Sequence, residues 1–108
     1  MTQPENPIGL DGFEFVEFTS PDPEAMGRLF EKLGFTRIGD HRTKAIRHYC
    51  QGDVHFLLNM EEGGHAREFH EAHGPSASAM AFRVEDGAKA LEQAVERGAT
   101  ATEGDFDL

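Results

Sequence analysis

Apolar residues in the first third of the chain recur at two different periods, which predicts a strand followed by a helix. From Gly12 to Phe18 the residues fit a β-strand of period two, with Phe13, Phe15 and Glu17 on one side and Glu14, Val16 and Phe18 on the other. Asp22 is then placed to cap a helix that starts at Pro23 and stops at Gly34. The apolar positions of this helix fall at i, i+3, i+4 and i+7: Met26, Leu29, Phe30 and Leu33.

Three more strand-like stretches follow this helix, at Phe35–Asp40, Ala45–Gln51 and Val54–Met60. Gly52 and Asp53 separate the last two, and glycine at the first central position suits a type II′ two-residue hairpin. The facing pairs are then Gln51/Val54, Cys50/His55, Tyr49/Phe56, His48/Leu57 and Arg47/Leu58. One hairpin face is consequently apolar, with Tyr49, Val54, Phe56 and Leu58. The stretch Glu61–His73 is predicted to be a loop carrying a short exposed helix around Ala66–Ala72.

The strand and helix pattern recurs about sixty-five residues later, which indicates an internal repeat. A second strand is predicted at Ser76–Val84, and Asp86 is placed to cap a helix over Gly87–Arg97 that stops at Gly98. The equivalent positions are Phe15 and Met80, Met26 and Leu91, Leu29 and Ala94, Phe30 and Val95. Only Ala99–Leu108 remains, enough for one short strand at most. We therefore expect an α+β fold with one complete βαβββ module and a truncated second module.

Length and charge narrow the possible functions. A chain of 108 residues predicts one domain over residues 11–108, preceded by a polar arm over residues 1–10. Lys and Arg number 10 against 20 Asp and Glu, and the net charge of -10 argues against nucleic acid as a partner. The sequence contains no apolar run long enough to span a membrane and no signal peptide, so a cytoplasmic protein is expected. A single cysteine, Cys50, excludes an intrachain disulfide.

Two groups of side chains suggest metal binding. In the predicted hairpin register, His48, Cys50 and His55 share one face and are a possible ligand set. We favour a half-exposed strand face, because a fourth ligand is missing. The second group lies in the acidic segment after the hairpin: His65, His70 and His73, with Glu68 and Glu71 between them. The five-residue separation of His65 and His70 keeps them off one regular helix face, so a solvated acidic surface is the favoured interpretation.

The sequence evidence for other kinds of site is weaker. Ser20, Ser76 and Ser78 lack the glycine pattern of a nucleophile elbow, and the glycines match neither phosphate-binding spacing. One local concentration of positive charge exists, formed by Arg37, His41, Arg42, Lys44 and Arg47. It could bind a carboxylate or pair with another domain or subunit, but a solvated strand edge protected from aggregation is the favoured interpretation.

Several short motifs together resemble one family. They are ENPIGLDGFEFVEF at residues 5–18, HRTK at 41–44, YCQG at 49–52, FLLN at 56–59, HGPS at 73–76 and MAFRV at 80–84. This combination resembles the N-terminal, non-metal domain of the 4-hydroxyphenylpyruvate dioxygenases, and the resemblance runs from about Glu5 to Ala99. The family has the vicinal-oxygen-chelate fold, shared with glyoxalases and bleomycin-resistance proteins, in which βαβββ modules are paired.

The resemblance implies a function for the parent protein. The family converts 4-hydroxyphenylpyruvate and O2 to homogentisate and CO2 in tyrosine catabolism, with Fe(II) held by two histidines and a carboxylate in the C-terminal domain. Phe15 and Met80 occupy the positions of the family's histidine ligands, and neither can hold Fe(II). The resemblance therefore implies no catalytic, cofactor-binding or metal-binding residue in this chain, which alone is expected to be inactive. The expected partners are the chain's own C-terminal catalytic domain and further copies in a homo-oligomer.

A second interpretation belongs to a different class of protein. The chain could be a free-standing, glyoxalase-like protein that binds a small molecule. Its incomplete sheet would then be completed by strand exchange in a dimer. The sequence alone leaves the product of the parent open between homogentisate and hydroxymandelate.

Overall fold

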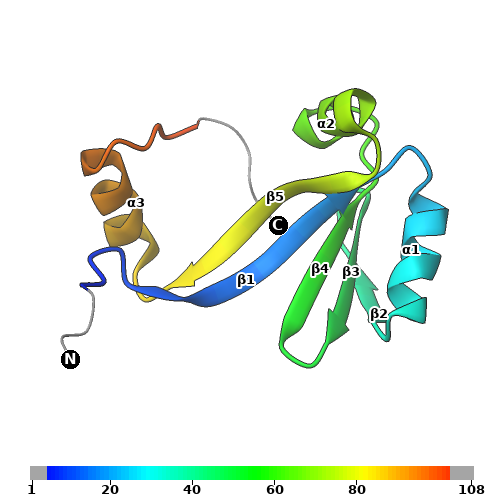
Figure 1. Ribbon diagram of the computed structural model, residues 1–108, viewed down its shortest axis with the longest axis horizontal. Coiled ribbons are helices and arrows are strands. Elements are labelled where there is room, and N and C mark those ends of the chain that lie inside the picture. Colours follow the sequence, from blue (N-terminus) through cyan, green and yellow to red (C-terminus); the bar gives the residue numbers. More distant parts are fainter. Residues whose placement is uncertain (1–4, 103–108) are drawn as a thin grey trace. The chain divides into compact units, whose positions relative to one another are not determined.

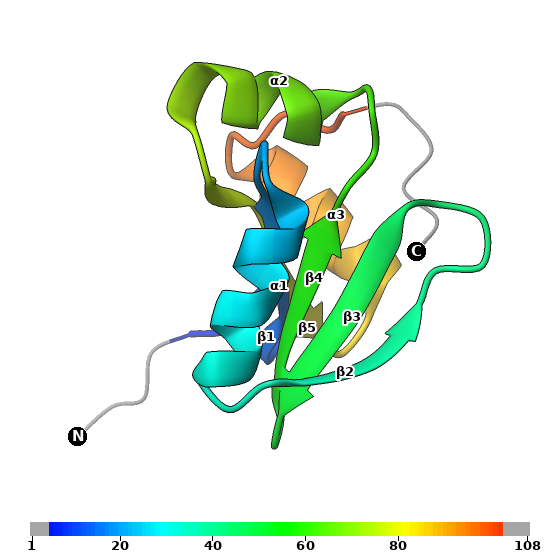
Figure 2. The same ribbon diagram turned by 90° about the vertical axis from the view of Figure 1, so that its right-hand side faces the viewer.

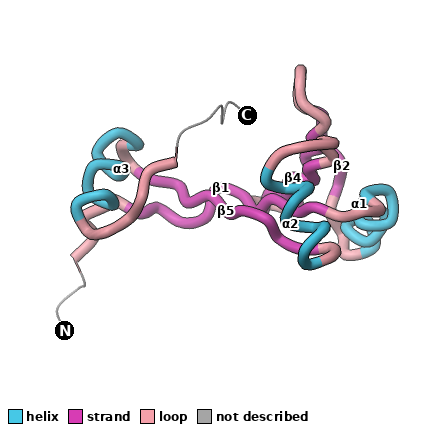
Figure 3. The backbone as a smooth tube through the Cα atoms, turned by 90° about the horizontal axis from the view of Figure 1, so that it is seen from above, coloured by secondary structure: helices cyan, strands magenta, loops and turns pink. Residues whose placement is uncertain are grey.

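The computed structural model describes residues 5–102 and contains five strands and three helices within that range. Their order along the chain is β1 (Leu10–Thr19), α1 (Pro23–Lys32), β2 (Thr36–Asp40), β3 (Ile46–Gln51), β4 (Val54–Asn59), α2 (His65–His73), β5 (Ser76–Val84) and α3 (Gly87–Glu96). The sheet has the strand order β2-β3-β4-β1-β5, with β5 beside β1 (Figure 1, Figure 3). The predicted α+β class and the order of its elements are confirmed.

The first module forms as expected. β1 pairs in parallel with β4, whereas β3 pairs antiparallel with both β2 and β4. All five predicted hairpin pairs are observed, from Gln51 opposite Val54 to Arg47 opposite Leu58. Gly52 adopts φ +60°, the left-handed conformation that glycine tolerates at this turn. The turn chemistry therefore set the register of the hairpin correctly.

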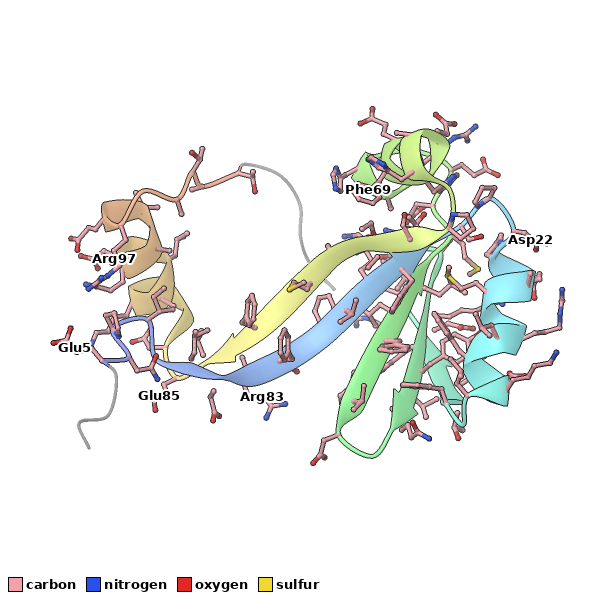
Figure 4. All side chains as sticks on the ribbon, viewed as in Figure 1. Glu5, Asp22, Phe69, Arg83, Glu85 and Arg97 are labelled. Atoms are coloured by element: carbon pink, nitrogen blue, oxygen red, sulfur yellow. The ribbon has the colours of Figure 1, made fainter. Side chains whose placement is uncertain are left out.

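Both predicted helix caps are present. The Asp22 carboxylate accepts a hydrogen bond from the Ala25 backbone N–H at the start of α1, where Figure 4 shows its position. The Asp86 carboxylate accepts one from the Lys89 backbone N–H at the start of α3. Each cap satisfies a backbone donor that the helix itself leaves unpaired.

The chain divides into two compact units, Phe13–Ala81 and the combination of Met1–Gly12 with Phe82–Leu108. In the first unit α1 covers one face of β3 and β4 (Figure 2). The core residues of this unit are aromatic and aliphatic: Phe30, Phe35, Tyr49 and Leu58, surrounded by Phe18, Met26, Phe56 and Met60. Phe30 lies at its centre, with ring centroids 5.1 Å from Phe18 and 5.2 Å from Tyr49.

In the second unit, the segment before β1 is held by local hydrogen bonds. The Asn6 side chain accepts a hydrogen bond from the Leu10 N–H and donates one to the Leu10 carbonyl. The Glu85 N–H donates to the Gly9 carbonyl at 3.0 Å, which ties this segment to the end of β5. The described part of the predicted arm is therefore tied down by hydrogen bonds, and β1 begins at Leu10 rather than Gly12.

The apolar stripes of the helices are only partly buried. On α1, Phe30 is buried, whereas Leu29 and Leu33 are 51% and 59% exposed. On α3, Ala90 is buried, whereas Leu91 and Val95 are 56% and 46% exposed. A short final strand was allowed within Ala99–Leu108; residues 99–102 contain none, and the rest lies outside the described residues.

Candidate functional site

The two positions that the family resemblance equates with metal ligands lie on neighbouring strands. Phe15 stands on β1 and is half-buried, and Met80 stands on β5 with 58% of its surface exposed. A phenyl ring offers no donor, and a thioether is a soft ligand, poorly suited to a ferrous ion that prefers imidazole and carboxylate. The residues present at these two positions therefore do not fit an iron site.

Polar residues on the same face are already hydrogen-bonded to one another. The Glu17 carboxylate accepts a hydrogen bond from the Ser78 hydroxyl at 2.8 Å and from the Asn59 amide at 3.3 Å. Side chains two residues apart on a strand share a face, so Phe15 lies on the side of Glu17 and Met80 on the side of Ser78. The face consequently presents one carboxylate together with a benzyl group and a thioether. Ser78, considered above as a nucleophile, has its hydroxyl directed at this carboxylate.

The hairpin histidines form a pair. His48 Nε2 and His55 Nδ1 are 2.8 Å apart, so one of these nitrogens donates and the other accepts. Burial lowers the pKa of His48, and the neighbouring His55 lowers it further. Cys50 lies opposite His55 on the same face. Across residues 5–102, however, no three or more His, Cys, Asp or Glu side chains are grouped in a way that could hold a metal ion.

The histidines of the acidic segment lie on α2, which is longer than the predicted short helix. The Phe69 ring, labelled in Figure 4, separates two of them, with centroids 5.7 Å from His65 and 4.5 Å from His73. His70 points elsewhere, and its Nδ1 is buried without a hydrogen-bond partner. The structure therefore does not bring the three histidines together.

The positive group is largely neutralised by ion pairs. Arg37 binds both carboxylate oxygens of Asp40, at 2.8 and 2.9 Å. Arg47 reaches from β3 to Glu24 on α1 at 2.9 Å, and this bond lowers the pKa of Glu24 and raises that of Arg47. Neither arginine is free for a ligand carboxylate.

The remaining basic residues of that group lie in the loop between β2 and β3. His41 Nδ1 accepts backbone N–H bonds from Thr43 and Lys44, at 3.1 and 3.0 Å. His41 is thereby used to shape the loop. These contacts favour the interpretation of a solvated strand edge.

A feature that the sequence did not indicate is a cavity of about 500 Å³ in the first unit. It lies between the β1–α1 turn, the end of β4 and α2. Its residues come from three separate segments, and no local motif connects them. Only the folded arrangement could have identified it.

The βαβββ arrangement defines the class of protein. A likeness to methylmalonyl-CoA epimerase from Mycobacterium tuberculosis has a TM-score of 0.65 at 16% identity, covers 83% of this chain and 66% of that one, and shows the fold alone. A xylose isomerase-like TIM barrel/4-hydroxyphenylpyruvate dioxygenase fusion protein matches with a TM-score of 0.82 and 36% identity over 94% of this chain and 17% of that one. The chain thus has the vicinal-oxygen-chelate fold.

Sequence comparison gives the family. Residues 4–107 match the model of the hydroxyphenylpyruvate dioxygenase N-terminal domain. A 4-hydroxyphenylpyruvate dioxygenase from Pseudomonas aeruginosa is 48% identical over 97 residues, 87% of this chain and 27% of that protein. A 3-dehydroshikimate dehydratase from the same organism is 43% identical over 86 residues, 78% of this chain and 14% of that protein. The chain belongs to the family of hydroxyphenylpyruvate dioxygenase N-terminal domains, and it spans about 27% of the length of the dioxygenase it matches.

Among the described residues, no helix is long and apolar enough to cross a membrane.

Proposed function

We propose that this chain is the non-catalytic N-terminal module of a 4-hydroxyphenylpyruvate dioxygenase. The proposed parent converts 4-hydroxyphenylpyruvate and O2 to homogentisate and CO2 in the cytoplasm, as a step in tyrosine catabolism. The observation that carries the proposal is the family match over residues 4–107, combined with side chains at positions 15 and 80 that cannot ligate iron.

Within the parent, this module would act as a scaffold for the catalytic domain and contribute contacts to a homo-oligomer. Fe(II) would be held in the C-terminal domain, where it would bind the oxo acid of the substrate and activate oxygen. The residues of this chain would hold their own sheet together. Glu17 supports this role, because its carboxylate joins β4 to β5 through Asn59 and Ser78.

The proposal is tested by measuring iron content and oxygen uptake. The 108-residue chain, incubated with Fe(II), ascorbate and 4-hydroxyphenylpyruvate, is expected to retain no stoichiometric iron and to consume no oxygen. The intact polypeptide is expected to do both, and to continue to do both when it carries Met80→Gln, because that exposed side chain is not a ligand. Stoichiometric iron in the isolated chain, or loss of iron from the intact Met80→Gln variant, would contradict the assignment.

A second candidate rests on the dehydratase and the fusion protein, in which the matching region covers only 14% and 17% of the other chain. In that case the parent would carry a TIM-barrel enzyme as well and would dehydrate 3-dehydroshikimate. Assaying the intact polypeptide for loss of 3-dehydroshikimate, in parallel with oxygen uptake, separates the two parents.

A further inference from the structure

The cavity in the unit Phe13–Ala81 is the strongest unassigned feature of the molecule. Its volume of about 500 Å³ lies within the usual range for small-molecule sites, roughly 300–1,000 Å³. Pro21 and Pro23 form its wall on the β1–α1 turn, and Met60 adds an apolar surface at the end of β4. This wall suits the hydrocarbon part of a ligand.

Most uncharged polar groups around the cavity are already used within the protein. The Ser20 hydroxyl oxygen accepts a hydrogen bond from the Asp22 N–H at 3.1 Å. The Asn59 side chain accepts from the Glu61 N–H at 2.9 Å and donates to Glu17 at 3.3 Å. These groups position the wall, so a ligand must be recognised by the charged residues.

Arg67 is the only Lys or Arg among the described residues that line the cavity, and it is committed as well. Arg67 binds the Glu71 carboxylate through Nε at 2.8 Å, and its Nη1 donates to the Glu62 carbonyl. The Arg67 bond lowers the pKa of Glu71, so Glu71 stays ionised near neutral pH. The arginine therefore forms its ion pair with Glu71 and interacts more weakly with the charge of Glu62.

Two carboxylates at the cavity form no salt bridge with a described side chain, although the charge of Glu62 helps to raise the pKa of Arg67. Glu61 accepts a single hydrogen bond, from the Ala45 N–H at 3.2 Å, and the carboxylate of Glu62 makes no ion pair in residues 5–102. Carboxylates accept hydrogen bonds and donate none. A ligand that binds to Glu61 and Glu62 must therefore be a hydrogen-bond donor, and a positively charged donor binds most strongly.

His70 supplies a second, independent indication of a ligand. The residue lines the cavity, and its Nδ1 is buried without a partner. Buried polar groups in folded proteins are nearly always hydrogen-bonded, and an orphaned one needs an explanation. A half-turn of the imidazole ring about its Cβ–Cγ bond exchanges Nδ1 with a ring carbon and would let this nitrogen accept a hydrogen bond from a bound donor.

We propose that this cavity binds a primary ammonium group carried on an apolar stem. The ammonium group would lie at Glu61 and Glu62, and it would donate a hydrogen bond to the unpartnered nitrogen of His70. The stem would lie along Pro21, Pro23 and Met60. A free amine and the lysine side chain of another domain or protein share this chemistry.

Phenethylamine is a suitable probe, and 2-phenylethanol is its neutral control. Titrating the 108-residue chain while following the Met60 methyl and His70 ring signals by NMR is expected to show saturable binding of the amine that is at least five-fold tighter than that of the alcohol. Equal binding of the alcohol, or no saturable change with up to 10 mM amine, would overturn the proposal.

Two variants test whether a carboxylate of the cavity recognises the positive charge of the amine. Glu62→Gln preserves shape and is expected to weaken amine binding at least three-fold. Glu31→Gln removes one charge from the exposed face of α1, away from the cavity, and is expected to leave binding unchanged. Equal weakening by both variants would mean that net charge alone attracts the amine, and would refute the site. Nα-acetyl-lysine-amide distinguishes the sources: tighter binding of this compound than of phenethylamine assigns the cavity to a protein side chain, and the reverse order assigns it to a free amine.

Discussion

Gly27 of α1 lies directly against the hydroxyl of Tyr49, so that a Cβ atom placed on Gly27 would stand 2.6 Å from that oxygen. Tyr49 is 1% exposed and packs edge-on against Phe30, which prevents it from moving aside. The absence of a side chain at position 27 therefore lets α1 approach β3 closely.

Gly27→Ala is expected to destabilise the protein by roughly 1–2 kcal/mol, although alanine favours helix by about 1 kcal/mol over glycine. Steric overlap with the buried ring outweighs the gain in propensity. Urea unfolding followed by circular dichroism measures the difference, and Gly87→Ala on α3, where an added Cβ meets nothing within 4 Å, is the control.

Combining Gly27→Ala with Tyr49→Phe tests whether steric overlap with the Tyr49 hydroxyl causes the loss of stability. Removal of the hydroxyl makes room for the methyl group, so the double variant should lose less stability than the sum of the two single changes. Strict additivity would show that the loss at position 27 has another origin.

Leu58→Ala is expected to cost about 2–5 kcal/mol of unfolding free energy, because Leu58 is completely buried in the core and the smaller side chain leaves a cavity. Leu29→Ala removes the same atoms from a position that is 51% exposed and should cost much less. Similar losses for the two variants, measured by urea unfolding, would contradict the described core.

The pair of His48 and His55 predicts a dependence of stability on pH. The pKa of His48 in the folded protein lies below its ordinary value of 6.5, chiefly because of burial. The unfolded state then binds more protons, so this contribution to stability is complete above about pH 7 and declines as the pH falls through 6.5.

The measurement is the midpoint of urea unfolding between pH 7.5 and 5. His48→Asn should flatten the pH dependence, and His73→Asn, at an exposed position, should leave it unchanged. An unaltered slope in His48→Asn would show that other groups cause the loss.

The isolated chain is expected to self-associate through the exposed apolar residues of α3. Leu91 and Val95 are 56% and 46% exposed, and each adjoins the other on one helix face. Size-exclusion chromatography with light scattering should detect a dimer or larger species that Leu91→Lys shifts toward monomer, whereas the same change at Glu92 should have little effect. A monomeric wild-type chain at high concentration would refute this expectation.

Local sequence rules predicted the local structure well. Asp22 and Asp86 cap the expected helices, and the Gly52 turn gives the expected register, because each depends on residues within a few positions of one another. Burial was predicted less well. Leu29 fits the periodic stripe of α1 but remains exposed, since burial depends on which strands lie beneath a helix, and this is not encoded in the helix itself.

The same limit applies to the candidate site: its local features were predicted from the sequence, and its long-range contacts were not. The sequence placed His48 and His55 on one face, as observed. That Phe15 and Met80 stand at the family's ligand positions stays a prediction from the repeat and the resemblance. The sequence did not reveal the bond from Ser78 to Glu17, which joins residues 61 positions apart, or the cavity around His70. Such features arise from contacts between distant segments, and one sequence carries no signal for them.

The carboxylate of Glu17 has a consequence for the integrity of the sheet. It links two strands that α2 separates in the sequence, because it accepts hydrogen bonds from Asn59 on β4 and Ser78 on β5. Replacing this one residue by an apolar side chain would therefore remove the carboxylate partner of two polar groups at once, one on either flank of β1.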